Sequence, residues 1–357
     1  MDNFENIIDI KVDKFDPKCS PITLGNSIVC DGYFFGKTTA VFTHFHEDHI
    51  KNFSRTLANC DHILLTETSL RAVKSILNSN LYRANLEPIS YGRKFHTDKG
   101  EIIELINANH VPGSCQVYVE MEENGTKILY SGDFCYPGIQ VPKCDYLVLD
   151  ATHGTSIHDY YTDKSSILRT IFDKVYDEIM KGHPVEIRAH SGSMQDILEQ
   201  IEKGNDGNTI PEAVPFLANK KHIELTEALS ISYNTGFREL KEATDSYLNE
   251  LYEKHQPYVR FATVGTNTPQ EDRGIVIQAD VNQEFAKKGP FFTHDSHRWY
   301  ACLSPHSSYS NILEYVKKTD PDFVVVDGTR ASKETASSLA QEITKRFSKP
   351  AKVITDK

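Results

Sequence analysis

Potential metal ligands are concentrated in one short segment, Thr43-His44-Phe45-His46-Glu47-Asp48-His49. Neutral imidazole and carboxylate are the groups that zinc prefers, at about 2.0–2.2 Å. The apolar run before His44 predicts a buried strand. On a loop that leaves such a strand, His44 and His46 can point at one ion. Asp48 and His49 can then turn toward a second. The alternative is a solvated histidine-rich loop, which would need no further ligands elsewhere in the chain.

Two later positions supply further ligands. His110 ends a strand-like segment and is followed by the turn-forming residues Val111-Pro112-Gly113-Ser114, while Asp133 follows Gly132 just after a second apolar run. Functional side chains commonly collect where strands end and loops begin. Either residue alone is a weak signal, because an aspartate after a glycine usually belongs to a turn. Together with the histidine segment, they complete two coordination spheres.

The elements that must position these side chains change character along the chain. Residues 1–150 contain short apolar runs typical of strands, and the Asn124-Gly125 pair predicts a two-residue hairpin turn between two of them. From about residue 160 onward, predicted strands alternate with helices whose apolar residues recur at three- and four-residue spacing. Such alternation predicts a parallel α/β unit. A strand at 322–328 and a helix at 332–347 are predicted near the end of the chain.

The order of the potential ligands resembles that of the metallo-β-lactamase superfamily. The resemblance rests on His44-x-His46-x-Asp48-His49, followed by His110 and Asp133, with Asp31 of Val29-Cys30-Asp31-Gly32 at the first motif. It implies that Asp31 is structural, beside the site. It also implies one zinc ion held by His44, His46, His110 and Asp133. A second ion would be held by Asp48, His49 and a bridging Asp133, with Asp48 also counted among the catalytic residues.

Longer segments resemble one branch of that superfamily, the β-CASP nucleases. Residues 108–114 (ANHVPGS) and 148–154 (VLDATHG) resemble the DNA-repair nucleases of the Artemis and Apollo type, and residues 302–328 resemble a region of the β-CASP nucleases as a whole. Ribonuclease J and the endonuclease of mRNA 3′-end processing are more distant members. The implied fold is α/β, an αββα metallo-β-lactamase sandwich with an inserted α/β β-CASP domain. The expected boundaries are 1–156 for the first part of the sandwich, 157–297 for the insertion and 298–357 for the second part.

The same resemblance, carried over residue by residue, places Asp150 and His306 in the catalytic machinery. Hydrolysis of a phosphodiester needs an activated water, neutralisation of charge on the phosphate and a proton for the leaving oxygen. His306 could supply that proton or contact the phosphate, and Asp150 could orient its ring. The alternative for His306 is a residue that merely precedes a helix cap, since serines follow it.

Further residues are candidates for phosphate or metal contacts. Ser307 and Ser308, with the helix N-terminus that follows them, could cradle a phosphate, and Lys37 could contact one. Asp327 stands where RNA-processing members of the family usually carry a zinc-binding histidine and DNA-repair members a valine. An aspartate there could ligate the second ion or pair with a base, so both possibilities remain open.

Composition limits the class of protein. The chain has 357 residues, enough for about two domains, with 25% charged residues and a net charge of −11. This charge disfavours indiscriminate nucleic-acid binding but is compatible with a local site that contains metal ions. The seven scattered cysteines form no CxxC pair, and the N-terminal residues do not resemble a signal peptide. These features indicate reduced thiols, no membrane partner and a cytoplasmic protein, or a nuclear one in a eukaryote.

The sequence features leave three functions to be compared. The first is a zinc-dependent nuclease, exo- or endonucleolytic, in which activated water attacks phosphorus and leaves a 5′-phosphate. Mn²⁺ or Mg²⁺ could replace zinc in assays. DNA is slightly favoured over RNA as the nucleic-acid substrate, because of the DNA-repair resemblance of 108–114 and 148–154. The second is a small-molecule hydrolase of thioesters, lactams or lactones, which the long insertion disfavours. The third is a non-catalytic nucleic-acid-binding subunit, which the complete set of ligands disfavours.

Overall fold

The computed structural model describes residues 7–11, 17–79, 81–159, 163–233, 236–266, 274–281 and 284–355. The chain divides into two compact units, one made of Met1–Asp159 and His306–Lys357 and the other of Tyr160–Pro305. Helices accompany three mixed sheets, so the predicted α/β class is confirmed at this level. None of the helices in the described residues has the length and apolar character that crossing a bilayer requires.

The first sheet of the first unit has six strands in the described residues, in the order β1-β2-β3-β4-β5-β6. The strands are β1 (Ile8–Ile10), β2 (Ile22–Leu24), β3 (Ile28–Cys30), β4 (Thr39–Val41), β5 (His62–Leu65) and β6 (Leu86–Pro88). Strands β3 to β6 run parallel. The helices α2 (Glu47–Ile50), α3 (Phe53–Asn59) and α4 (Glu67–Ile76) lie in the connections. Phe42 packs on Phe53, so α3 covers the face of the sheet opposite Val41.

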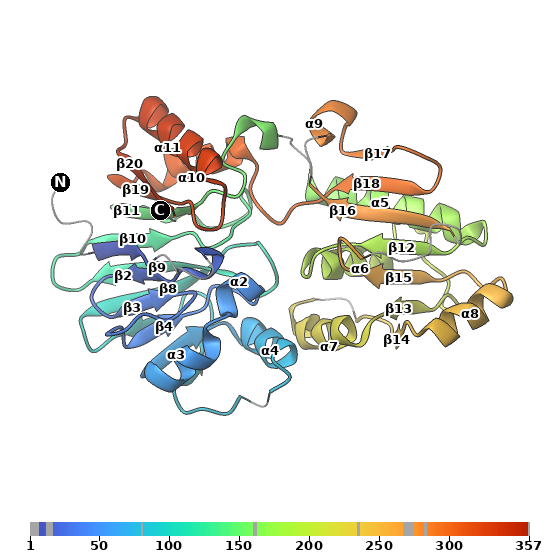
Figure 1. The fold of residues 1–357 in the computed structure, drawn as a ribbon, viewed down its shortest axis with the longest axis horizontal. Helices are drawn as coiled ribbons and strands as arrows, with labels where there is room; N and C mark the ends of the chain where they lie inside the picture. The colour runs from blue at the N-terminus through green and yellow to red at the C-terminus, as the bar shows by residue number, and fades with distance from the viewer. Residues whose placement is uncertain are drawn as a thin grey trace. The chain divides into compact units, whose positions relative to one another are not determined.

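The second sheet of this unit has seven strands in the part of the chain described, ordered β20-β19-β11-β10-β9-β8-β7. They are β7 (Lys94–His96), β8 (Glu101–Asn107), β9 (Cys115–Met121), β10 (Lys127–Tyr130), β11 (Tyr146–Asp150), β19 (Phe323–Asp327) and β20 (Ala351–Ile354). Both faces are buried, as alternate residues show: Val148 packs with the first sheet, while its neighbour Leu149 packs with the helices α10 (Tyr309–Thr319) and α11 (Lys333–Phe347). Figure 1 shows these two helices beside β19 and β20.

The predicted hairpin around Asn124-Gly125 is confirmed, with a longer loop than expected. Strands β9 and β10 pair antiparallel, but residues 122–126 all lie between them. Gly125 has a φ of +70°, a conformation that favours glycine. The side chain of Asn124 accepts a hydrogen bond from the N–H of Thr126 at 2.9 Å. This side-chain turn accommodates the additional residues.

The direction of the strands gathers several loops at one edge of the second sheet. Strands β8 and β10 both pair antiparallel with β9, so they run in the same direction, and β10, β11 and β19 are mutually parallel along the sheet. Their carboxyl ends therefore meet at the same edge. His110 and Asp133 follow two of these ends, and Asp150 and Asp327 close the other two. The N–H of Cys115 donates to the carbonyl of Thr43 at 2.9 Å, which holds the histidine segment at this edge.

The second unit contains a third sheet, whose described strands have the order β14-β13-β15-β12-β16-β18-β17. They are β12 (Val185–Arg188), β13 (Phe216–Ala218), β14 (Leu240–Glu242), β15 (Val259–Ala262), β16 (Ile275–Asp280), β17 (Phe291–Thr293) and β18 (Arg298–Cys302). The helices are α5 (Lys164–Met180), α6 (Ser193–Lys203), α7 (Lys220–Leu229), α8 (Asp245–Glu253) and α9 (Phe285–Lys288). Short 3-10 helices occupy Ser230–Ser232 in this unit and Pro17–Cys19 and Ser156–His158 in the first unit. All neighbouring strands of this sheet pair in parallel except β17 with β18, in line with the predicted strand–helix alternation.

The boundary of this unit differs from the expected one. Residues 298–305 were expected in the second part of the first domain, but β18 pairs in parallel with β16 and antiparallel with β17. Its backbone hydrogen bonds therefore place it in the third sheet. The second unit accordingly ends at Pro305, immediately before His306.

A buried carboxylate offers a test of how the first unit is held together. Glu101, at the start of β8, is fully buried and accepts hydrogen bonds from the N–H groups of Asn26 and Ser27 at 2.7 and 2.8 Å. We expect Glu101→Ala to lower the free energy of unfolding by about 3 kcal/mol, because the buried N–H of Ser27 and the partly buried N–H of Asn26 both lose a charged partner. Urea denaturation measures this change. Glu104→Ala on the same strand, where the side chain is only partly buried, is the control, and equal losses in both variants would contradict the expectation.

Candidate metal centre

Four predicted ligands converge at the edge described above. Atoms of His44, His46, His110 and Asp133 all lie within 4.8 Å of one another, and this group could bind a metal ion. Nδ1 of His46 is 3.1 Å from Nε2 of His44 and 3.2 Å from Nε2 of His110. Oδ2 of Asp133 lies 3.7 Å from each of the same two nitrogens. Ligand atoms about 2.1 Å from a tetrahedral ion are roughly 3.4 Å apart, so this spacing fits one ion.

The protonation of His44 favours a ligand. Burial, and then the neighbouring histidines His49, His46 and His110, lower its pKa well below the usual range, so the ring is neutral. Oγ1 of Thr43 donates to Asp31 at 2.8 Å and lies 3.1 Å from Nδ1 of His44. That hydroxyl can therefore only accept from His44, which places the proton on Nδ1 and leaves the lone pair of Nε2 for an ion.

Asp31 holds the histidine segment in place through buried hydrogen bonds. It is fully buried and accepts from the N–H of Thr43 at 2.7 Å, the hydroxyl of Tyr130 at 2.9 Å and Nδ1 of His49 at 2.9 Å. Burial alone would raise the pKa of Asp31, but His49 and other neighbours lower it, so the carboxyl stays charged. This is the structural position that the resemblance implies for Asp31.

His49 is turned toward Asp133. Its Nε2 is buried and makes no hydrogen bond in the described structure, and it lies 3.5 Å from Oδ2 of Asp133 and 3.7 Å from Oδ2 of Asp48. Burial lowers its pKa, but Asp133 and Asp31 raise it to about 10. Among the described residues, the mutually close groups of potential ligands do not include Asp48, whose side chain is 38% exposed. The expected second set is thus only partly assembled.

Asp150 and His306 form a pair beside the first group. Nδ1 of His306 lies 3.1 Å from Oδ2 of Asp150, and atoms of Asp133, Asp150 and His306 lie within 4.8 Å of one another. The ring of His306 packs on that of His110, with centroids 4.5 Å apart. Burial lowers the pKa of His306, but the hydrogen bond and charge of Asp150 raise it above the usual value. Asp150 thus favours the protonated form of this imidazole next to the potential metal ligands.

The two serines after His306 have different surroundings. The hydroxyl of Ser307 is buried, donates to the carbonyl of Phe134 and accepts from the N–H of Tyr136, so it fastens this turn and does not face a ligand. Ser308 is the N-cap residue of α10. The carboxylate of Asp159 already accepts hydrogen bonds from the backbone and hydroxyl of Ser310 in the first turn of that helix. An anion is therefore already present where the sequence predicted a phosphate cradle.

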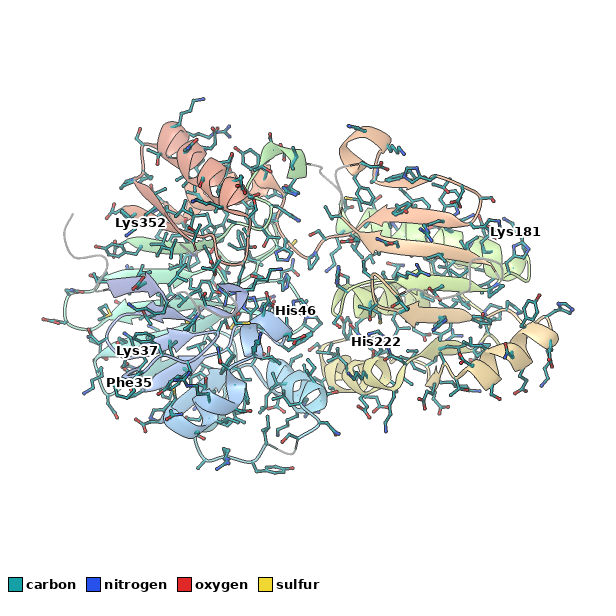
Figure 2. All side chains as sticks on the ribbon, in the orientation of Figure 1. Phe35, Lys37, His46, Lys181, His222 and Lys352 are labelled. Atoms are coloured by element: carbon teal, nitrogen blue, oxygen red, sulfur yellow. The ribbon has the colours of Figure 1, made fainter. Side chains whose placement is uncertain are left out.

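The structure does not bring Lys37 to this site. Its ammonium group donates to the carbonyls of Gly25 and Asn26 at 2.8 and 3.0 Å. It precedes β4, whereas His44 follows this strand, and seven extended residues span about 23 Å. Figure 2 shows Lys37 and His46 well apart within the first unit.

Asp327 also stays out of the potential metal group. Its Oδ1 accepts from the N–H and hydroxyl of Thr329 at 2.8 and 2.6 Å, and its Oδ2 accepts from Nη1 of Arg330 at 2.8 Å. Both oxygens are thus occupied by protein donors. Of the two roles left open for Asp327, the structure shows a pair with a basic residue, and the sequence reasoning assigned no role to Arg330.

His153 is a second residue whose place the sequence did not reveal. It is buried, with Nδ1 3.1 Å from the carbonyl of Ser307, and its ring lies 5.5 Å from that of His306 and stacks at 4.8 Å on His158. Burial, followed by the nearby His306 and His158, lowers its pKa to about 3, so the ring is neutral. The sequence did offer one indication of this place. His153 follows Asp150 by three residues, and the loop after a strand lies at the same edge of the sheet as the end of that strand.

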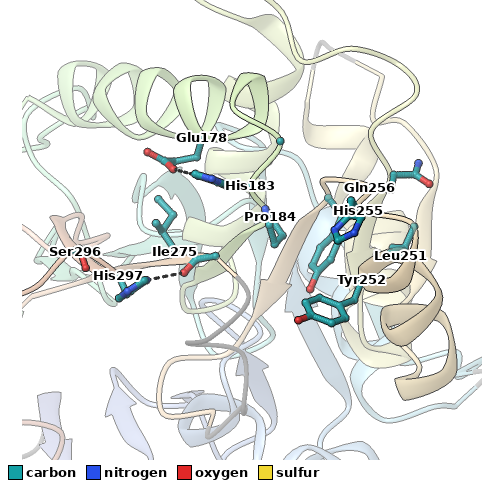
Figure 3. A pocket seen from close by; sticks show the side chains of 13 residues that line it. Glu178, His183, Pro184, Leu251, Tyr252, His255, Gln256, Ile275, Ser296 and His297 are labelled. Atoms are coloured by element: carbon teal, nitrogen blue, oxygen red, sulfur yellow. Dashed lines mark hydrogen bonds and ion pairs between the residues drawn. The ribbon is translucent and has the colours of Figure 1, made fainter.

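The second unit has a cavity of about 400 Å³ with a different character. It lies where the parallel strands begin, lined by residues such as Pro184, Tyr258 and His297 that precede β12, β15 and β18 (Figure 3). Its one acidic side chain, Glu178, already binds Lys174, Lys181 and His183. Within the described residues, neither group of mutually close potential metal ligands includes a residue of this cavity.

Comparisons with known proteins give distant similarities. No family model matches the chain. Probable RNase MJ4 of Methanocaldococcus jannaschii is 27% identical in an alignment of 106 residues that covers 27% of this chain and 23% of that protein. The chain thus matches about a quarter of the length of this relative. The crystal structure of a protein of unknown function from Enterococcus faecalis V583 has a TM-score of 0.57 at 10% identity, covering 86% of this chain and 89% of that one. The latter likeness concerns the fold alone.

The convergence of the four ligand side chains predicts a metal-binding phenotype. We expect His46→Ala and Asp133→Ala to lower the metal content of the purified protein several-fold, because each removes one donor from the group. Elemental analysis after gel filtration measures this. His62→Ala is the matched control, since His62 is a half-buried histidine of β5 that pairs with Glu87. Unchanged metal in both ligand variants would show that the ion binds elsewhere.

Proposed function

We propose that this chain is a metal-dependent nuclease with a metallo-β-lactamase fold and a β-CASP-type insertion. The observation that carries the proposal is the position of the Asp150–His306 pair, which shares a neighbour, Asp133, with the group of potential metal ligands. Phosphodiester hydrolysis needs both a cation and a proton donor at one place. The two-sheet core with α10 and α11 outside the second sheet supports the proposed fold.

RNA is the substrate that we favour. The resemblance of two sequence motifs to DNA-repair nucleases slightly favoured DNA as the substrate. The relative in Methanocaldococcus jannaschii, however, is named as a probable RNase. The similarity to that protein extends over part of the chain only. RNA as the substrate is therefore a proposal, which a direct comparison of cleavage of the two nucleic acids tests.

Zinc is the ion that best fits the donor set. Three imidazoles and one carboxylate suit zinc, while Mg²⁺ and Ca²⁺ prefer oxygen donors. His44, His46, His110 and Asp133 would hold it. When bound, such an ion supplies Lewis acidity, lowering the pKa of water and stabilising charge on the phosphate.

The remaining steps fall to side chains of this chain. His306, whose protonated form Asp150 favours, would donate its proton from Nε2 to the leaving 3′ oxygen, so that the other product carries a 5′-phosphate. Asp150 holds the ring through Nδ1, and its other oxygen is fixed by the N–H and hydroxyl of Thr152. His153 fixes the carbonyl of the residue after His306. These contacts restrict the ring before substrate arrives, which lowers the cost of orienting it.

The substrate assignment is tested by direct comparison. We expect the zinc-loaded protein to cleave labelled single-stranded RNA faster than DNA of the same sequence and to leave a chromogenic ester intact, with all cleavage lost in a chelator and restored by added zinc. Denaturing electrophoresis measures the products. Faster cleavage of DNA would reverse the substrate assignment, and turnover of the ester alone would replace the nuclease with a small-molecule hydrolase.

The roles of Asp150 and His306 predict a separation of turnover from metal binding. We expect His306→Ala to lower kcat by about 10²–10⁴-fold, the usual contribution of a general acid. Asp150→Asn should lower it by about 10–100-fold, because the ring loses its orienting charge. Both variants should keep the wild-type metal content. The cleavage rate and elemental analysis of the same preparations measure this, and wild-type turnover in His306→Ala would remove this residue from the mechanism.

A further inference from the structure

The segment of the first unit that precedes the insertion is bonded to the turn that follows the insertion. The second unit is Tyr160–Pro305, so Asp159 and His306 are the two residues of the first unit that flank it. Asp159 lies 151 positions from Ser310 in the sequence. Its two carboxylate oxygens nevertheless accept from the N–H and the hydroxyl of Ser310, at 3.1 and 2.7 Å. These bonds join the two flanking parts of the first unit at the base of the insertion.

Asp159 acts as the N-terminal cap of α10. The side chain of Ser308, the N-cap residue by position, makes no capping hydrogen bond within the described part of the chain. The first N–H groups of a helix have no partners inside the helix, and a carboxylate beside them also complements the charge of the helix end. Asp159 satisfies one of these groups, the N–H of Ser310. The start of α10, three residues after His306, therefore depends on a residue that precedes the insertion.

His153 holds the other end of the same turn. Its Nδ1 lies 3.1 Å from the carbonyl oxygen of Ser307. Because a carbonyl oxygen can only accept, Nδ1 carries the proton. The ring is 7% exposed and stacks on the ring of His158, with centroids 4.8 Å apart and planes inclined by 16°. Burial, stacking and the hydrogen bond together leave this ring few other orientations.

The backbone between these two contacts is itself packed on the fold. The N–H of Gly154 donates to the carbonyl of Ala151 at 3.0 Å. A Cβ at Gly154 would lie 3.1 Å from Cβ of Leu339 and 3.1 Å from Cγ2 of Thr335, so the backbone lies directly against α11. The segment that holds the turn is thus fixed by contacts of its own within the first unit.

We propose that segment 153–159 positions the imidazole of His306 by holding the turn 307–310 at both of its ends. His153 and Asp159 are positioning residues, which act through this turn. Asp150 orients the ring of His306 through its side chain, and the segment fixes the backbone from which the ring projects. The general acid is then oriented by the first unit itself, although 156 positions separate His306 from Asp150 in the sequence. The effect on turnover rests on the proposed function, whereas the effect on the turn rests on the hydrogen bonds alone.

Hydrogen exchange tests the hold on the turn without reference to activity. His153→Phe keeps a buried ring but removes the N–H that bonds to Ser307, and Asp159→Ala removes the cap of α10. We expect the amides of residues 307–312 to exchange about three- to tenfold faster in each variant than in the wild type, because local opening of the turn breaks one hydrogen bond fewer. Mass spectrometry of the peptide that covers these residues measures this.

The second unit offers a matched control for each variant. His222 of α7 is also a buried histidine, 8% exposed, with Nε2 3.1 Å from Oγ1 of Thr263. Asp163 is also a carboxylate at a helix start, accepting from the N–H of Ser165 in α5 at 3.1 Å. His222→Phe and Asp163→Ala should leave exchange in residues 307–312 and the rate of cleavage unchanged.

A double-mutant cycle with His306 tests the effect on turnover. We expect His153→Phe and Asp159→Ala each to lower kcat about tenfold for labelled single-stranded RNA or DNA, whichever the wild type cleaves faster, with KM and metal content unchanged. Asp159→Asn should lose less than Asp159→Ala, because its amide oxygen can still accept from the N–H of Ser310. In a His306→Ala background neither change should lower kcat further, because the ring that the segment positions is absent.

The outcomes separate this inference from the proposed function. Unchanged exchange in both variants overturns the inference, and so does an equal further loss of kcat in the His306→Ala background. Absence of cleavage by the zinc-loaded wild type overturns the nuclease proposal and the effect on turnover, while exchange still decides whether the segment holds the turn. Circular dichroism establishes the folding of each variant. If His153→Phe does not fold, Asp159→Ala decides the matter, since the side chain of Asp159 is exposed.

Discussion

The buried carboxylate of Asp31 is the constraint on which the rest of the site depends. A charge without solvent must be met by donors, and Asp31 finds them in the backbone of Thr43, the hydroxyl of Tyr130 and the ring of His49. These donors come from the histidine segment after β4, from the second sheet and from α2. Satisfying one anion therefore joins the histidine segment and α2 to the second sheet, whose Tyr130 lies 99 residues from Asp31 in the sequence. The orientation of His44 follows, because the hydroxyl that donates to Asp31 also fixes its Nδ1.

The edge above Asp31 is an unfavourable arrangement for the protein alone. Three imidazoles approach one another to nitrogen separations near 3.1 Å, and the buried ring of His44 is kept neutral. Lone pairs that face each other in a poorly solvated place destabilise a fold unless a cation or proton lies between them. This close grouping of three imidazoles and one carboxylate is the physical reason why the group could bind a metal ion.

Much of this could be predicted from the sequence, for reasons that are local. The spacing of His44, His46 and His49 is contained in one segment, and His110 and Asp133 each follow an apolar run, so strand ends could be located without tertiary structure. The position of Lys37 was also within reach, since it precedes the strand that His44 follows. The pairing of Asp327 with Arg330 had a local signal too, a basic residue three positions on.

Other features depend on neighbours that are distant in the chain. The hydroxyl of Ser307 is occupied by backbone groups of Phe134 and Tyr136, more than 170 residues earlier, and no pattern around Ser307 announces them. The assignment of β18 to the third sheet depends on its pairing with β16 and β17, where an apolar run alone would fit either unit. Residue type and spacing were thus sufficient to locate the potential ligands. They were not sufficient where the role of a residue depends on a partner elsewhere in the chain.

The local pairing of charges also resolves the difficulty raised by a net charge of −11. Each buried acid at the site has its own compensation: Asp31 pairs with His49, Asp150 with His306 and Asp327 with Arg330. The field that an approaching phosphate meets is set by the nearest uncompensated groups, because salt screens charges beyond about 8–10 Å. Because these three acids already pair with basic side chains of the protein, they do not cancel the positive charge that an ion at the histidine group would add. An acidic chain can therefore present a locally cationic site to a polyanion.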